Sequence, residues 1–396
     1  MRSFPETIIE IYDEEQIYNV LAVCEFKPKN VVYRGTRKLK NKRIKNNIIS
    51  CLRSLGLTTK CFFYSTDMLS INSVISELEN ILSIFGECAI DLTGGNEVAL
   101  VAVGMLAKER GIPLFRYDRY AQMYRNIYEC EAAADVVSEP KFNINAVLAL
   151  AGGAMKSHGH VSVDGLDKDT SDDIFRTWTI YKKYHRVWSR TVSYLQQISK
   201  DLEGEQLHID ASAVIYGGDR ISGADKAVMN ELCESGLIRN YKNDGKRISF
   251  DYKNPLIRSC LCDIGVCLEL YVYAAAISAG VYDDVQISVV IDWDGDLNAR
   301  INTINEIDVM LTRGAVPVFI SCKSGSVNTT TLNEIKTLTT QFGGVLARPV
   351  LVTMANVRTA DKHLLQRAVD MGIDIIDRND LLHERLSKRL YALSKL

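Results

Sequence analysis

The chain has 396 residues, of which 47% are hydrophobic and 24% are charged, the proportions of a folded globular protein rather than a disordered one. Its length exceeds what one hydrophobic core usually fills, so we expect two or three domains. The 47 Lys and Arg residues against 49 Asp and Glu residues give a net charge of −2, which excludes a global basic field. Any contact with nucleic acid must therefore come from a local patch.

The ten cysteines are scattered, and several lie inside apolar runs, as Cys61, Cys88 and Cys267 do. This distribution favours reduced thiols in the core of a cytoplasmic protein. The sequence has no long apolar leader near residue 1 and no stretch of about 18 uncharged apolar residues. We therefore expect no membrane partner.

The first 117 residues alternate between β-type and helical patterns. Strands alternating with helices of this length pair in parallel through right-handed crossovers, which predicts an open, doubly wound, Rossmann-like α/β sheet. The expected strands are residues 7–12, 30–33, 60–64, 87–92 and 113–117, and the expected helices are residues 15–26, 38–55, 70–85 and a segment ending near 110.

Ligands of doubly wound sheets bind beyond the carboxyl ends of the strands. In the loop Thr93-Gly94-Gly95-Asn96, the glycines would let backbone N–H groups approach a phosphate, the next helix offers its N-terminus, and Thr93 has a hydroxyl donor. A glycine turn with a helix cap explains the loop equally well. The Gly-x-Gly-x-x-Gly fingerprint is absent, which disfavours a conventional dinucleotide site. The candidate ligand residues are Tyr12, Asp13, Gly35, Thr36, Ser65, Thr66, Thr93, Gly94, Gly95 and Asn96.

The pattern becomes irregular after residue 117. An apolar stretch at 146–154 precedes a predicted polar loop at 155–160, where His158 and His160 lack partners at metal-ligand spacing. Residues 164–173 have the composition of a linker, and 181–202 predict a helix whose aromatic stripe favours packing over base stacking.

Residues 225–253 predict a helix followed by a β-hairpin, because Asp244-Gly245 is a strong hairpin-turn signal. A helix followed by a basic hairpin is similar to the end of a winged helix. Such a hairpin would touch nucleic acid, although a spacer or packing module is at least as good an interpretation. The basic candidates are Arg239, Lys242, Lys246 and Arg247.

From Pro255 we expect one long apolar helix through residue 279, within which Glu269 is an unusual carboxylate. A buried acid must be paired, neutral or bound to a metal. The strand at 286–291 leads to an acidic turn containing Asp292, Asp294 and Asp296, either a plain turn or a second cation site. Helices at 332–341 and 361–371, strands at 345–353 and 373–376, and an exposed charged helix to 396 complete the expected elements.

The acidic residues Glu306 and Asp308 precede an apolar run at 309–311. A turn containing Gly314 follows, and a second apolar run at 316–320 leads into Ser321-Cys322-Lys323. Two such runs predict a hairpin whose ends bring Asp308 and Lys323 together. Carboxylates there suit Mg²⁺ or Mn²⁺, which use one or two carboxylates together with waters and substrate phosphates. The alternative is an ordinary hairpin with solvated charges at its ends.

Glu306-Ile307-Asp308 and Ile320-Ser321-Cys322-Lys323, with Glu269 upstream, resemble the PD-(D/E)xK nuclease motif of ancillary nucleases in type III CRISPR systems. This resemblance implies an α/β/α restriction-endonuclease-like domain, with Mg²⁺ or Mn²⁺ bound by Glu269, Glu306 and Asp308. Ser321 departs from the common pattern, which has an acid two residues before the lysine; Glu306 would supply that carboxylate. The implied catalytic residues are Glu269, Glu306, Asp308, Ser321 and Lys323.

The segment from Asp91 to Glu97 is similar to the signature of CRISPR-associated Rossmann-fold (CARF) sensor domains. This resemblance implies binding of a cyclic oligoadenylate, with cyclic tetra-adenylate as the expected activator, across the two-fold axis of a homodimer. Family members often have a lysine where Asn96 stands. In its place Lys156, Arg37 or Arg34 would neutralise the phosphates.

These expectations divide the chain into a CARF-like sensor at 1–150, a helical linker with a winged-helix-like module at 151–253, and a nuclease domain at 254–396. The leading hypothesis is a metal-dependent nuclease, activated by cyclic oligoadenylate, that cleaves DNA or RNA in antiviral CRISPR defence. One rival is a ligand-responsive transcription regulator that binds DNA through the module. Another is a small-molecule enzyme whose Gly-Gly loop holds a nucleotide cofactor.

Overall fold

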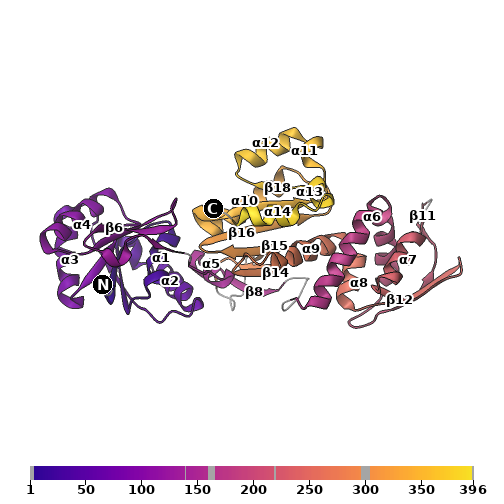
Figure 1. The fold of residues 1–396 in the computed structure, drawn as a ribbon, viewed down its shortest axis with the longest axis horizontal. Coiled ribbons are helices and arrows are strands. Elements are labelled where there is room, and N and C mark those ends of the chain that lie inside the picture. Colours follow the sequence, from indigo (N-terminus) through magenta and orange to yellow (C-terminus); the bar gives the residue numbers. More distant parts are fainter. Residues whose placement is uncertain (1–3, 139, 159–165, 218–219, 296–303, 395–396) are drawn as a thin grey trace.

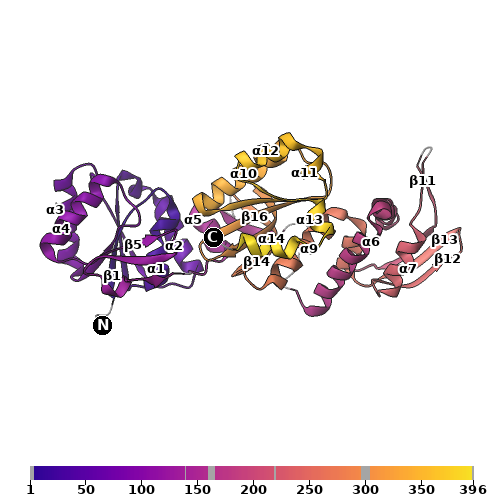
Figure 2. The ribbon, with the colours of Figure 1, turned by 45° about the horizontal axis from the view of Figure 1, so that its top comes forward.

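The computed structural model describes residues 4–138, 140–158, 166–217, 220–295 and 304–394, which form three bodies along one long axis (Figure 1). An N-terminal α/β domain occupies one end, a second α/β domain the middle, and a module of helices and hairpins the other end. The same order is visible after a turn about the horizontal axis (Figure 2). We call these bodies the N-terminal domain, the middle domain and the distal module.

The N-terminal domain is a seven-stranded sheet in the order β3-β2-β1-β4-β5-β6-β7, with helices on both faces. Strands β1 to β5 pair in parallel, which confirms the predicted doubly wound sheet. Helices α1 and α2 cover one face and α3 and α4 the other, since their apolar side chains join two separate cores. The bounds are β1 Thr7–Ile11, α1 Leu21–Phe26, β2 Asn30–Gly35, α2 Lys42–Ser54, β3 Lys60–Ser65, α3 Ile71–Phe85, β4 Cys88–Asp91, α4 Glu97–Arg110 and β5 Leu114–Asp118.

Three details of this domain differ from the expected pattern. The helix expected at 15–26 is divided into the 3₁₀ helix η1 (Gln16–Asn19) and α1, and the helix expected at 38–55 into η2 (Arg37–Lys40) and α2. The second division occurs at Asn41, whose side chain caps α2 by accepting from Arg43 N. Beyond residue 117 the chain adds two antiparallel strands, β6 (Met123–Tyr128) and β7 (Val136–Val137), which the sequence pattern did not predict.

The chain reaches the middle domain earlier than expected. Helix α5 (Ile144–Ala151) packs between α2 and the middle sheet, and β8 (Ala154–His158) is the edge strand of that sheet, antiparallel to β14. The loop predicted over 155–160 is therefore wrong for residues 155–158, which belong to a strand of the middle sheet. Lys156 belongs to this edge strand and not to the N-terminal sheet, while His160 and Asp164 lie outside the described residues.

The middle sheet has the order β18-β17-β16-β15-β14-β8. Helices α9, α13 and α14 pack on one face, and α5, α10 and α12 on the other, which gives the expected α/β/α layers. Contrary to expectation, the C-terminal helix is not simply exposed, because it buries Leu386, Leu390 and Leu393. The bounds are β14 Asp284–Asp292, β15 Ile304–Arg313, β16 Val316–Lys323, α10 Thr329–Gly343, β17 Arg348–Thr353, α11 Val357–Ala360, α12 Lys362–Asp370, β18 Asp374–Ile376, α13 Arg378–Leu382 and α14 Leu386–Leu393.

The distal module combines a long helix with a small antiparallel sheet. The sheet order β12-β13-β9, with α7 directly before the β12–β13 hairpin, is the arrangement of a winged helix and confirms the predicted helix and hairpin. Helix α6 starts earlier than predicted and is kinked at Tyr184. The bounds are α6 Lys168–Ser199, β9 His208–Ser212, β10 Ile215–Gly217, β11 Arg220–Ser222, α7 Lys226–Glu234, β12 Ile238–Asn243 and β13 Arg247–Tyr252.

The single long helix expected at 255–279 is two helices, α8 (Pro255–Cys262) and α9 (Ile264–Ala279), bent by 120°. Asp263 interrupts the pattern because its carboxylate caps α9, accepting from Gly265 N at 2.7 Å. Within the described ranges, no single helix is long and apolar enough to cross a membrane. The bend leaves α9 buried against the middle sheet, where its carboxylate Glu269 is held.

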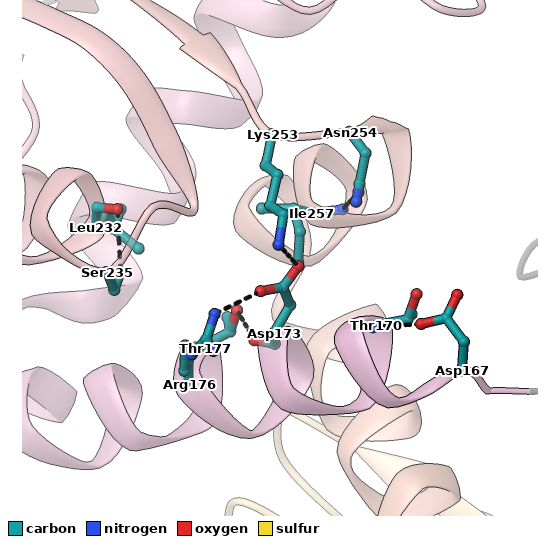
Figure 3. A network of polar contacts seen from close by, with 10 residues as sticks. All are labelled: Asp167, Thr170, Asp173, Arg176, Thr177, Leu232, Ser235, Lys253, Asn254 and Ile257. Carbon is teal, nitrogen blue, oxygen red and sulfur yellow. Dashed lines mark hydrogen bonds and ion pairs between the residues drawn. The ribbon is translucent and has the colours of Figure 1, made fainter.

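A buried ion pair joins α6 to the segment that leads into α8 (Figure 3). Asp173 is 2% exposed; it accepts from Arg176 at 3.0 Å and forms a second ion pair with Lys253. Next to Lys253, Asn254 caps α8 by accepting from Ile257 N at 2.9 Å. Because a buried carboxylate is costly unless it is paired, this contact fixes α6 against the segment between β13 and α8.

Candidate functional site

The β15–β16 hairpin brings an acid and a lysine together, as the sequence predicts. The two strands pair antiparallel from Val309 with Ile320 to the turn. Oδ2 of Asp308 accepts from Cys322 N at 2.6 Å and from the Ser321 hydroxyl at 3.2 Å, and it lies 3.5 Å from Lys323 Nζ. Three consecutive residues of β16 therefore fix one carboxylate oxygen of β15, and Ser321 orients Asp308 rather than adding a carboxylate.

Glu269 reaches the same cluster from α9 and is 6% exposed. Burial first, and then repulsion from the Asp308 and Glu306 carboxylates, raises the pKa of Glu269 to about 8. The ammonium group of Lys323 opposes this rise. The carboxylates of Asp308 and Glu306 therefore lie near enough to Glu269 to affect its pKa. A cation bound among these carboxylates would reduce their mutual repulsion.

Glu306 stands at the exposed edge of the cluster. Its Oε1 accepts from the Ser288 hydroxyl, on the neighbouring strand β14, at 2.7 Å. Ser288 was not predicted from the sequence, since a serine inside an apolar run carries no motif signal. Its role is visible only once β14 and β15 are paired.

A hard cation fits the chemistry of this cluster, which supplies carboxylate and hydroxyl oxygens beside a lysine. Among the described residues, however, no three His, Cys, Asp or Glu side chains are arranged as a ready metal site. The residues therefore suit an ion held by few protein ligands, with waters and substrate oxygens completing its shell, as is usual for Mg²⁺. That Glu269, Glu306 and Asp308 all bind the ion stays a prediction.

The predicted ligand loops of the N-terminal domain meet at one edge of its sheet. Strands β1 and β4 are adjacent, and the strand order reverses between them, which is where doubly wound sheets bind ligands. Asp13 Oδ2 accepts from Gly95 N at 3.1 Å, so the loops after β1 and β4 are in contact. Tyr12 N bonds Arg34 O and Thr66 N bonds Gly35 O, which brings the loops after β2 and β3 to the same edge.

Close packing explains the two glycines of the β4 loop. A Cβ atom on Gly94 would lie 2.6 Å from Asp13 Cβ, and one on Gly95 would lie 2.4 Å from Ile11 Cγ2. Gly95 also has φ of +102°, which side chains rarely permit. The turn-and-cap interpretation of this loop therefore holds, whatever the loop binds.

Several predicted phosphate donors of this edge are already used. The Thr93 hydroxyl donates to Asp91 and accepts from Tyr117 N at 2.8 Å, so its hydrogen is already used. Donation from Thr93 to a ligand stays a prediction and would require the bond to Asp91 to break. Asn96 caps α4 by accepting from Ala99 N, and Thr36 likewise caps η2. These polar groups organise the loops and do not project a ready set of donors.

The three basic residues proposed to replace a lysine at position 96 lie in different places. Arg34 is fully buried and donates to Ser73 O at 3.4 Å on the side of the sheet covered by α3. Lys156 lies in the middle sheet. Arg37 is exposed in η2, directly after Thr36, and is the one of the three that lies beside the ligand loops.

A pair of buried acids beneath these loops was also not predicted from the sequence. Glu10 and Asp91 are register partners on β1 and β4, and both are buried. Burial raises the pKa of Asp91 to about 7, against the hydrogen bonds from Thr93, and burial with repulsion from Asp91 raises the pKa of Glu10 well above its usual range. The signal available in the sequence was a lone glutamate inside the apolar run of β1.

Comparisons with protein-family models and with curated proteins give no match. Two solved structures match the chain over nearly its whole length. Protein VC1899 from Vibrio cholerae matches with a TM-score of 0.75 at 17% identity, covering 99% of this chain and 100% of that one. Can2 from Sulfobacillus thermosulfidooxidans, solved in complex with cyclic tetra-adenylate, matches with a TM-score of 0.67 at 16% identity, covering 97% and 99%. The chain therefore has the fold of these two proteins from its N-terminal sheet through its middle domain.

Proposed function

We propose that this protein is a CRISPR effector that binds a cyclic oligoadenylate through its N-terminal domain and cleaves nucleic acid at the Asp308–Lys323 cluster. The observation that carries the proposal is the convergence of Asp308, Lys323 and the buried Glu269 at one position on the middle sheet. The resemblance of both sequence motifs to known families and the ligand in the Can2 structure support it.

The residues of the cluster have separate tasks in the proposed phosphodiester hydrolysis. Asp308 is held in one orientation by Cys322 N and Ser321, and Lys323 places a positive charge beside it. That charge would stabilise the negative charge that develops on the attacked phosphate. A bound Mg²⁺ or Mn²⁺, held by Asp308 with Glu269 and Glu306, would supply an activated water and further charge neutralisation.

The proposed ligand is cyclic tetra-adenylate, bound at the loops after β1 and β4. A phosphate entering this site would compete with Asp13 for the Gly95 N–H group, since Asp13 occupies it now. Arg37 would supply a positive charge beside these loops. Binding would therefore rearrange the loop after β1, which continues directly into residues between the two α/β domains.

A homodimer would present these loops twice to a ring-shaped ligand. Helix α4 begins at the ligand loop and leaves Val101 and Met105 more than half exposed, one turn apart. An apolar stripe of this kind suits the two-fold contact of such a dimer. We place the proposed dimer contact on α4 for this reason.

A cavity of about 380 Å³ between the N-terminal and middle domains gives the proposed activation a physical route. Glu14, Gln16 and Arg43 line it on one side, and Pro317 and Phe342 on the other. Arg43 also bridges the two domains, donating to Gly152 O at 3.2 Å and Trp293 O at 3.1 Å. Movement of the loop after Asp13 would change the packing at this interface. Ligand binding would activate the protein if the ligand binds more tightly to one packing arrangement of the two domains than to another.

The direct test uses the whole protein with labelled single- and double-stranded DNA and RNA. Each substrate is incubated with Mn²⁺ or with EDTA, and with or without each member of a panel of cyclic oligoadenylates. We expect cleavage only when Mn²⁺ and one cyclic oligoadenylate are both present. Absence of cleavage in every combination, with intact fold, would refute the nuclease assignment.

The distal module supports a second candidate, a ligand-responsive regulator that binds duplex DNA. Its winged-helix sheet order favours this function, and Arg239, Lys242 and Lys246 are exposed on the hairpin. Arg247, the fourth basic candidate, instead pairs with Asp210 at 2.8 Å. This candidate predicts metal-independent duplex binding that is lost when the three exposed residues are replaced by alanine, which an electrophoretic mobility assay would detect.

A further inference from the structure

Ser288 has an unusual backbone for a residue in the middle of a strand. It lies five residues into β14, it is fully buried, and its φ is +52°. A side chain in this left-handed region is uncommon in any setting, because Cβ crowds the backbone. Such strain persists where the surrounding structure determines it, and it is often found at functional sites.

The strain coincides with a change of face in β14. Ile287 belongs to the core on the α9 side of the middle sheet, whereas Val289 belongs to the core on the α5 side. In a regular strand, residues two apart face the same side. The left-handed conformation of Ser288 is the break in this alternation.

The paired strand changes face at the matching position. On β15, Ile307 lies in the α5-side core and Val309 in the α9-side core. Between them is Asp308, which stands opposite Ser288 because the flanking residues are register partners. The two strands therefore break together at the carboxylate of the candidate active site.

The Ser288 hydroxyl has a specific partner at this break. It donates to Glu306 Oε1 at 2.7 Å, across the strand pair and beside Asp308. Glycine would adopt the same backbone at lower cost, so the hydroxyl is what serine adds at this position. A purely structural break would not need it.

We propose that Ser288 is a positioning residue, which uses its strained backbone and its hydroxyl to hold Glu306 beside Asp308 for cation binding. This inference rests on the proposed function for the identity of the cluster. It adds a residue that lies outside both sequence motifs. Ser288 acts through Glu306 and needs no contact with the substrate.

The test compares Ser288→Ala with Ser288→Gly, since both remove the hydroxyl and glycine also relieves the strain. Mn²⁺ affinity is measured by calorimetric titration, the midpoint of thermal unfolding is recorded, and cleavage is assayed. Ser249→Ala, a half-buried strand serine in the distal module, is the matched control. We expect both Ser288 variants to bind Mn²⁺ about tenfold more weakly, the order for one hydrogen bond to a charged group, and Ser249→Ala to be unchanged.

The outcomes separate this inference from the proposed function. If Ser288→Gly binds Mn²⁺ as tightly as the unaltered protein, only the backbone matters and the inference is overturned. If the unaltered protein cleaves nothing, but both Ser288 variants weaken Mn²⁺ binding, the nuclease assignment fails and the positioning role stands. If the unaltered protein does not bind Mn²⁺, both fail.

Discussion

The two predicted sites of this chain differ in how their polar groups are used. At the middle-domain cluster, charged side chains from two strands and a helix converge, and Glu269 is held where its own charge is disfavoured. At the N-terminal loops, the polar groups are already engaged with one another: Asp13 accepts from Gly95 N, and the Thr93 hydroxyl donates to Asp91. The first arrangement gathers carboxylate oxygens that suit a cation, and the second must rearrange to accept an anion.

This difference shows what a motif conveys at each site. Burying a carboxylate and placing other carboxylates near it are both costly, so a function is the simpler explanation for the position of Glu269. Glycines and small polar residues at a strand end also satisfy packing and helix caps, so the same residues serve structure and ligand binding. The comparison is therefore tested most strongly by removing charge from the first site and contacts from the second.

The largest effect is expected from Asp308→Asn and Lys323→Ala. Each should reduce cleavage by about 10²–10³-fold or more, because in the proposed reaction Asp308 would hold the cation and Lys323 would stabilise the charge that develops on the phosphate. Lys388→Ala, at an exposed position on α14, is the matched lysine control. The measurement is a single-turnover cleavage rate alongside the thermal unfolding midpoint. Normal cleavage by either site variant would end its catalytic assignment.

The next effect concerns the ion pair that joins α6 to the segment before α8. Asp173→Ala should destabilise the protein by about 2 kcal/mol, since it removes the charged hydrogen-bond acceptor of Lys253, whose side chain is three-quarters buried. The exposed Asp169 on the same helix provides the control, and Asp169→Ala should change stability by less than about 0.5 kcal/mol. Chemical denaturation of both variants measures the difference. Equal stabilities would mean that the ion pair does not fix α6 against this segment.

The extent to which these features could be predicted follows from the range of the interactions involved. The β-α alternation and the β15–β16 hairpin are local patterns, and the sequence predicts them. The edge strand β8 and the buried face of α14 depend on packing between distant segments, which periodicity does not record. The break at Asp263 has a local cause, a helix cap, but the apolar pattern on both sides of Asp263 hides it. At the site, Asp308 and Lys323 were predictable from strand ends, whereas Ser288 depends on strand pairing.

The pH dependence of stability should reveal that Glu269 is buried beside the other carboxylates of the middle-domain cluster. Because the pKa of Glu269 is raised to about 8, the folded protein binds a proton that the unfolded chain has released above its ordinary carboxyl pKa. Stability should therefore fall, by about 1 kcal/mol per pH unit, between pH 6 and 8 in metal-free buffer. Denaturation across this range should show a flatter profile for Glu269→Gln. A wild-type profile identical to that of the variant would mean that neither burial nor the neighbouring carboxylates raise the pKa of Glu269 in the folded protein.

The smallest effect is expected at the N-terminal loops, where the direction of the change in ligand affinity tells how Asp13 is used. Asp13→Asn removes a negative charge beside Gly95 and should tighten binding of cyclic tetra-adenylate by about fivefold, or roughly 1 kcal/mol. Glu6→Gln, which removes a carboxylate just before β1 that is paired with Lys29, should leave the affinity unchanged. Calorimetric titration with the cyclic nucleotide measures all three proteins. Weaker binding by Asp13→Asn would mean that Asp13 accepts hydrogen bonds from the ligand, for which the adenine amino group is the natural donor. These loops would then bind their ligand without the rearrangement proposed for them.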